Sequence, residues 1–220
     1  SDTTITCPTA SKFVANVAQL LLNLFGCCTA LLLLRVVQST QIHPNCKYLL
    51  SSWSLGYLSL FIAHARISLM NLEMDDLPVN KMIPHSRSLS IDVSVASQFA
   101  CALWEISIAT ERLISAIHPA AYYKSGRKGR VLYPVTALIL CLAAVQGYIT
   151  EVSQHFLAAA VILVIDVCTI TINSISVRYC QRRFQSMHGK VSLNARYQVR
   201  EAHDIASSMQ RSYIVCFFFK

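Results

Sequence analysis

Apolar segments of roughly 20 residues or more, the length that a helix needs to cross a bilayer, recur along this chain. Hydrophobic residues make up 54% of the sequence and charged residues 14%, whereas an ordinary soluble domain has about 25% charged residues. A soluble helical chain would instead carry apolar stripes of about three residues in seven, and the alternation typical of a membrane β-barrel is absent. The sequence therefore predicts an all-α, polytopic transmembrane helix bundle.

Five of these segments are long enough to be complete spans. We expect them at 13–37, 48–72, 88–117, 131–150 and 156–177. The polar residues 1–12 precede them, and 178–211 form a basic segment whose second half reads as a helix. A sixth span begins at 212–220, which is too short to cross a bilayer. We therefore expect a truncated bundle.

The lysine and arginine residues predict which side of the membrane each segment faces. With the N-terminus outside, 13 of the 19 basic residues fall in inner segments and three in outer ones. Cytoplasmic segments carry such an excess, so we expect an extracellular N-terminus and basic cytoplasmic loops that meet lipid headgroups. The net charge of +8 then needs no nucleic-acid partner.

The sequence contains no motif that is typical of an enzyme or of a cofactor-binding site. The nine cysteines form no CxxC pair and no Cys/His ligand spacing, so we expect neither a metal nor a redox site. There is no nucleophile elbow, HExxH pair or phosphate-binding loop. We therefore expect a protein that is not an enzyme.

Ionisable residues inside a span are costly unless they are paired or hydrated, so each one marks a candidate site. Arg66 and Asp92 lie at similar depth and either pair or line an outward-facing pocket. Asp166 lies near the middle of the fifth span, with no basic residue expected at that depth. Glu105 is expected to join an interior polar network. His64 is either an interior hydrogen-bonded histidine or a ligand or proton-relay group.

A charged pair, Glu111-Arg112, stands at the inner end of the third span. One interpretation is a membrane-end anchor whose side chains reach toward the headgroups. The other is a switch, in which acidic groups hold Arg112 in a resting state and a helix movement releases it to a cytosolic partner. The sequence alone leaves both interpretations open.

The chain resembles two families of receptors in its motifs. Glu111-Arg112, with His118-Pro119 six and seven residues further on, is similar to the Asp/Glu-Arg-Tyr motif of rhodopsin-like receptors, although Leu113 replaces the tyrosine. A closer resemblance, over residues 42–211, is to the nematode serpentine chemoreceptors, most of all their alpha-beta class. It is carried by His43-Pro44-Asn45, by Glu111-Arg112 followed by Tyr122-Tyr123-Lys124, and by Arg196-Tyr197-Gln198 with Glu201 three residues on.

The resemblance implies a seven-helix, G-protein-coupled chemosensory receptor in the plasma membrane of sensory cilia. It further implies a small-molecule ligand outside and a heterotrimeric G protein inside. Arg112 would be the signalling switch, Glu111 a restraint on it and Glu201 a second restraint. The chain departs from the family at Ala202, where an asparagine is usual, and at 86–88, where a cysteine is expected.

Two alternatives stay open beside the receptor. One is a truncated, non-signalling receptor fragment that lacks most of helix six and all of helix seven. The other is a small transporter or channel in which His64, Asp92, Glu105 and Asp166 relay charge. The sequence shows no repeat between its halves and no pair of Gly/Pro-broken helices, which makes the transporter the weaker alternative.

Overall fold

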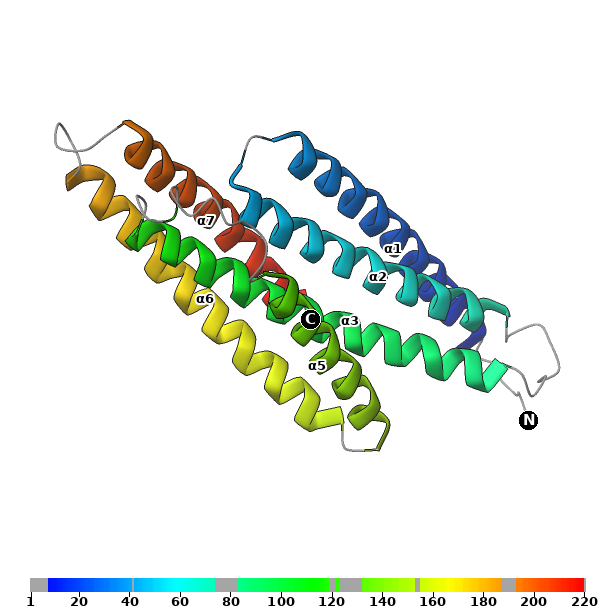
Figure 1. Ribbon diagram of the computed structural model, residues 1–220. Helices are drawn as coiled ribbons and strands as arrows, with labels where there is room; N and C mark the ends of the chain where they lie inside the picture. Colours follow the sequence, from blue (N-terminus) through cyan, green and yellow to red (C-terminus); the bar gives the residue numbers. More distant parts are fainter. Residues whose placement is uncertain are drawn as a thin grey trace, which may run out of the picture.

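The computed structural model describes residues 8–40, 42–73, 83–118, Tyr122, 132–152, 155–186 and 193–219. Over these residues the chain forms an elongated bundle of helices and no strand, which confirms the all-α prediction (Figure 1). The helices are α1 (Pro8–Ser39), α2 (Pro44–Glu73), α3 (Ile83–Ile117), α5 (Leu132–Val152), α6 (His155–Ser186) and α7 (Leu193–Phe219).

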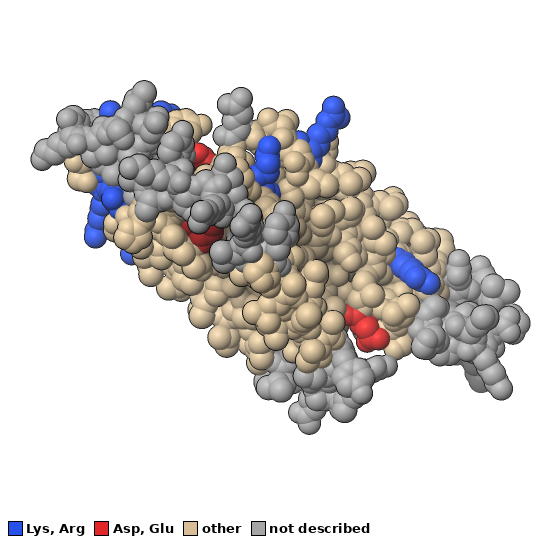
Figure 2. All heavy atoms as spheres, in the orientation of Figure 1, with Lys and Arg blue, Asp and Glu red and all other residues tan. Residues whose placement is uncertain are grey.

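Four stretches in these helices are long and apolar enough to cross a membrane: Lys12–Ser39, Pro44–Leu72, Ser88–Ile117 and Ala159–Ser186. In α5 the apolar stretch Pro134–Gln146 is shorter. The bundle exposes large apolar side chains along its outer surface, and Leu22 and Phe25 of α1 are 70% and 69% exposed. Figure 2 shows a broad area without charged side chains over the middle of the bundle. The protein is therefore a membrane-embedded helical bundle.

Several helices extend beyond the ranges expected from the sequence. We predicted that the fifth span ends at residue 177 and gives way to a loop, but α6 continues to Ser186. The added residues include no glycine or proline, the residues that most often end a helix. The predicted helix from residue 192 and the apolar run from 212 form one helix, α7. Residues 1–7 and the basic residues 124–130, which lie between the third and fourth expected spans, are outside the described residues.

Helix α3 occupies the centre of the bundle and packs against α2, α5, α6 and α7, while α1 packs against α2 (Figure 1). The buried core between α2 and α3 includes Leu49, Trp53, Trp104 and Ile108. The two helices approach closely at Gly56, where an added Cβ would lie 2.5 Å from Cζ3 of Trp104. A small residue at this position therefore sets the distance between α2 and α3.

Replacing Gly56 tests this close approach. Gly56→Val is expected to destabilise the bundle by about 1–3 kcal/mol, because the added methyl groups overlap the Trp104 ring and the helices must separate. Thermal unfolding of the detergent-solubilised protein measures the change. Ala137→Val, at an exposed position of α5, is the control and should leave the unfolding temperature unchanged. Equal behaviour of the two variants would contradict the packing described.

Candidate functional site

Arg112 lies five residues before the end of α3, and its side chain is only 2% exposed. Among the described residues it is the largest of the fully buried side chains. An arginine stays charged in any protein environment, and burying a charge costs several kcal/mol unless partners compensate for it. The groups around Arg112 therefore decide whether this arrangement is stable.

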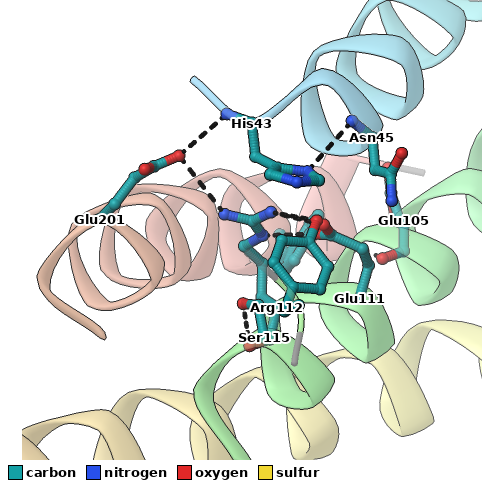
Figure 3. A network of polar contacts seen from close by, with 9 residues as sticks. His43, Asn45, Glu105, Glu111, Arg112, Ser115 and Glu201 are labelled. Carbon is teal, nitrogen blue, oxygen red and sulfur yellow. Dashed lines mark hydrogen bonds and ion pairs between the residues drawn. The ribbon is translucent and has the colours of Figure 1, made fainter. Parts of the chain in front are cut away.

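Two carboxylates face the Arg112 guanidinium (Figure 3). Nε donates to Oε2 of Glu111, and Nη2 donates to Oε1 of the same residue at 2.6 Å. This two-point pairing is the geometry in which guanidinium and carboxylate interact most strongly. From α7, Oε1 of Glu201 lies 3.9 Å from Nη1. Both acidic side chains are about nine-tenths buried, at 10% and 9% exposed. Arg112 thus joins α3 to α7.

Glu201 makes a second contact, to the start of α2. Its Oε1 accepts the backbone N–H of His43 at 3.2 Å, as Figure 3 shows. Nδ1 of His43 accepts the N–H of Asn45 at 3.3 Å, so His43 caps α2, and Pro44 occupies the first helical position, where proline is favoured. A carboxylate near a helix N-terminus is also stabilised by the helix dipole. Glu201 therefore bridges Arg112 and the N-terminus of α2.

Tyr122 closes another side of the site. Nη2 of Arg112 donates to the Tyr122 hydroxyl at 3.4 Å. The Tyr122 ring lies against the His43 ring, with centroids 4.1 Å apart and planes inclined at 43°. Its backbone N–H donates to the His118 carbonyl at 2.9 Å. Tyr122, five residues beyond the end of α3, is thus tied to both Arg112 and the α2 cap.

An apolar cluster lies at the same end of the bundle as this polar site. Ala116, Cys180, Val199 and Ala202 are buried together, and Phe184 packs against them. They come from α3, α6 and α7. Charge interactions are stronger in such surroundings than in water, because the local dielectric constant is lower. The cluster therefore strengthens the pairing of Arg112 with its carboxylates.

Arg183 of α6 caps the end of α3, a role that the sequence did not suggest. Its Nη1 donates to the carbonyls of Ala116 and Ile117 at 2.7 and 2.5 Å and to the Tyr179 hydroxyl at 3.0 Å. The last carbonyls of a helix lack partners within it, and an arginine satisfies them well. The signal that we missed is the Tyr179–Arg183 pair, whose spacing of four residues places both on one helical face.

Glu105 lies in an interior polar network, two helical turns from Arg112 on α3. It is 2% exposed, and its Oε1 accepts hydrogen bonds from Trp53 Nε1 at 3.2 Å and from the Tyr57 hydroxyl at 2.8 Å. The Tyr213 hydroxyl of α7 donates to its backbone carbonyl at 3.3 Å. This network connects α2, α3 and α7, the same helices that meet at Arg112.

Arg66 and Asp92 do not pair in the structure, which has no ion pair between them within the described residues. Their helices align as expected, since His64 lies beside Ser94 with Nε2 and Oγ 3.0 Å apart. Two residues along a helix turn a side chain by about 200°, so Arg66 and Asp92 point away from this contact. Arg66 instead lines an open cavity of about 330 Å³ with Ser90. The proposed pairing was therefore wrong.

Asp166 is 5% exposed on a buried polar stripe of α6 that continues through Thr169, Asn173 and Ser176. Nδ2 of Asn173 donates to the Ala206 carbonyl of α7 at 2.8 Å. The sequence analysis did not single out Asn173. Its place one turn beyond Thr169, on the face that carries Asp166, is the signal that would have found it. The stripe therefore attaches α6 to α7 within the bundle.

Only some of the residues that carry the family resemblance contact the Arg112 site. Glu201 and His43 contact the Arg112 site. Arg196 lies over the Phe184 ring, with Cζ 5.1 Å from its centroid, and Tyr197 is 58% exposed. The side chain of Gln198 lies outside the described residues. Within this motif, Glu201 is thus the residue that reaches Arg112.

Comparison with known proteins gives no match, either to a family model or to a curated protein. The part of the chain that the structure describes contains no group of three His, Cys, Asp or Glu side chains arranged to hold a metal ion. The site is therefore defined by its own geometry, as a buried ion-pair cluster at a junction of helices.

The role of Arg183 can be tested against its neighbour in the chain. Arg183→Met is expected to lower the free energy of unfolding by about 1–3 kcal/mol, because two carbonyls at the end of α3 lose a charged donor. Arg182→Met removes an exposed arginine one position away and should have little effect. Thermal unfolding of both variants measures the difference. If the two substitutions are equally harmless, Arg183 does not hold α3 and α6 together.

Proposed function

We propose that this protein is a G-protein-coupled chemosensory receptor, in which Arg112 is the switch that a small-molecule cue releases. The observation that carries the proposal is the burial of Arg112 between Glu111 and Glu201. A membrane-end anchor would extend its charge toward the headgroups. The Arg112 guanidinium instead points into the bundle, where the carboxylates of Glu111 on α3 and Glu201 on α7 neutralise it. Such an arrangement suits a group that is held in one state and exposed in another.

The convergence of three sequence segments supports the same function. His43-Pro44-Asn45, Glu111-Arg112 and Glu201 carry the resemblance to the serpentine chemoreceptors, and they are far apart in the sequence. In the bundle they lie within one contact network (Figure 3). A resemblance made of unrelated fragments would have no reason to converge in this way.

The switch works through the position of α7. In the resting state Glu201 lies at Arg112 and at the cap of α2. If α7 moves away, Arg112 loses one of its two carboxylates and becomes accessible to carbonyl or acidic groups of a G protein. Separating partners of a buried pair is costly. A ligand shifts the equilibrium only by its difference in affinity for the two states.

The basic residues give the proposed orientation. Arg178, Arg182 and Arg200 are exposed near the junction of α6 and α7, and Figure 2 shows basic side chains toward this end. An excess of Lys and Arg is typical of the cytoplasmic side. The Arg112 site would then face the cytoplasm and its G protein, with the N-terminus outside and the receptor in the plasma membrane of sensory cilia.

Removing the Glu201 charge tests the restraint. Glu201→Gln is expected to raise basal G-protein activation about fivefold or more, because a coupling of about 1 kcal/mol that favours the resting state is lost. The measurement is G-protein activation per receptor at the cell surface, compared with that of the unmodified protein. Asp204→Asn is the control, since Asp204 is on the same helix but 65% exposed in a surface pair with Arg200.

Removing the switch itself should have the opposite effect. Arg112→Ala is expected to abolish activation by a cue, and to abolish the raised basal activation of Glu201→Gln when the two are combined. The signal is again normalised to receptor at the surface, since loss of Arg112 leaves buried carboxylates unpaired and lowers stability. Undiminished signalling by Arg112→Ala would show that Arg112 is structural only.

A further inference from the structure

The open cavity of about 330 Å³ that Arg66 lines is a groove between α2 and α3, which we call the Arg66 groove. Its wall on α2 is a stripe that starts at Leu55, passes Ile62 and ends at Arg66. The helical rise makes this stripe roughly 16 Å long. On α3 the groove is lined by Leu89, Ser90 and Val93. The Arg66 groove is therefore long and mostly apolar, with a cation at one end.

The Arg66 groove is open to the outer surface of the bundle. Leu55, Ile62 and Leu89 are 52%, 55% and 53% exposed along it, and in a membrane such side chains face hydrocarbon. A molecule dissolved in the bilayer can therefore enter the groove from the side. The volume is near the lower limit of small-molecule sites, about 300 Å³, which suits one alkyl chain rather than two.

Arg66 lies at a depth where its charge needs a partner. The span Pro44–Leu72 has its middle at Leu58, so Arg66 is about 12 Å from the midplane along the helix, whereas the hydrocarbon core extends about 15 Å from it. Arg66 is exposed, and none of the ion pairs within the described residues includes it. An ionised arginine at this depth is costly unless it is paired or hydrated. The groove therefore suits a molecule that brings an anionic group.

The direction of α2 points the Arg66 side chain along the groove. Side chains of an α-helix lean toward the N-terminus of the helix. Arg66 is near the C-terminal end of α2, so its side chain leans back toward Ile62 and the middle of the membrane. To reach the headgroups at the near surface, the guanidinium would have to turn against this lean. Pairing within the groove is therefore favoured over pairing at the surface.

We propose that the Arg66 groove binds a fatty acid from the bilayer. The carboxylate pairs with the Arg66 guanidinium, and the single alkyl chain lies along the stripe from Ile62 to Leu55. Guanidinium and carboxylate form a strong two-point pair. The phosphate of a phospholipid is a poorer partner, because it lies outside the hydrocarbon core and is attached to two chains. Binding at this groove does not rest on the proposed receptor function.

Thermal unfolding in phosphatidylcholine nanodiscs tests the site. The probe is dodecanoate, at alkaline pH so that its carboxylate is ionised, and the comparison is 1-dodecanol, which has the same chain without the charge. A ligand stabilises the state that binds it. Dodecanoate should therefore raise the unfolding temperature in a saturable way, and 1-dodecanol should raise it much less. Equal effects of the two compounds would reflect partitioning into lipid and overturn the proposal.

A matched pair of arginine variants isolates the charge. Arg66→Gln should weaken dodecanoate binding about tenfold or more, measured from the concentration dependence of the unfolding temperature, because a charged hydrogen-bond partner is lost. Arg35→Gln removes an exposed arginine of α1 that does not line the groove and should preserve binding. Unchanged binding by Arg66→Gln overturns the proposal.

A matched pair of phenylalanine variants locates the alkyl chain. Ile62→Phe places a ring in the middle of the Arg66 groove and should abolish the response to dodecanoate. Leu69→Phe, at a position that is also exposed on α2 but does not line the groove, should preserve it. Equal responses from these two variants would show that the chain binds elsewhere.

The source of the anion is tested by changing the lipid. Replacing part of the phosphatidylcholine with phosphatidylglycerol, without dodecanoate, should shift the unfolding temperatures of the unmodified protein and of Arg66→Gln equally. A rise confined to the unmodified protein would show that Arg66 binds a phospholipid headgroup and would overturn the fatty acid. These experiments use purified protein without a G protein, so their failure leaves the Arg112 switch untouched. Likewise, failure of the Glu201→Gln prediction leaves fatty-acid binding untouched.

Discussion

The buried guanidinium of Arg112 imposes the strongest constraint on this end of the bundle. Its charge requires carboxylates that are buried with it, and Glu111 and Glu201 supply them from two helices. Two carboxylates leave an excess negative charge, and the capped N-terminus of α2 offsets part of it through the His43 N–H. The relative positions of α2, α3 and α7 at this end therefore follow from one ionised side chain.

Polar contacts between helices have the same importance elsewhere in the bundle. In lipid, apolar side chains gain little by leaving one apolar environment for another, so packing and interhelical hydrogen bonds hold helices together. Glu105 with Trp53 and Tyr57, His64 with Ser94, and Asn173 with the Ala206 carbonyl are such contacts. The contacts that hold α7 in the bundle are thus also those that position Glu201 at Arg112.

Much of this architecture could be predicted from the sequence, because apolar length reports directly on membrane-spanning helices. The charge pattern at the end of the third span also selected Glu111 and Arg112, and the resemblance to the serpentine chemoreceptors selected Glu201. The bundle brings these three side chains together. The depth of Arg66 and Asp92 in the membrane could be estimated from their positions in the spans. The direction in which each side chain points depends on the neighbouring helix, and the sequence does not show it. Arg183 and Asn173 were missed because they donate to backbone carbonyls, which every residue offers. Helical spacing places each of them on a polar face, but it does not show which carbonyl the side chain reaches.

Two hydrogen bonds to backbone carbonyls involve α7, and both lie C-terminal to Glu201. Asn173 holds the helix at Ala206, and the Tyr213 hydroxyl holds it at Glu105. Glu201 stands beyond both, about 7–8 Å along the axis from Ala206 at 1.5 Å per residue. Because these contacts hold α7 at Ala206 and Tyr213, a bend of the helix near Ala206 would displace Glu201 by an amount that grows with its distance from Ala206. In the proposed switch, the N-terminal part of α7 would therefore act as a lever arm that carries Glu201 toward Arg112 or away from it.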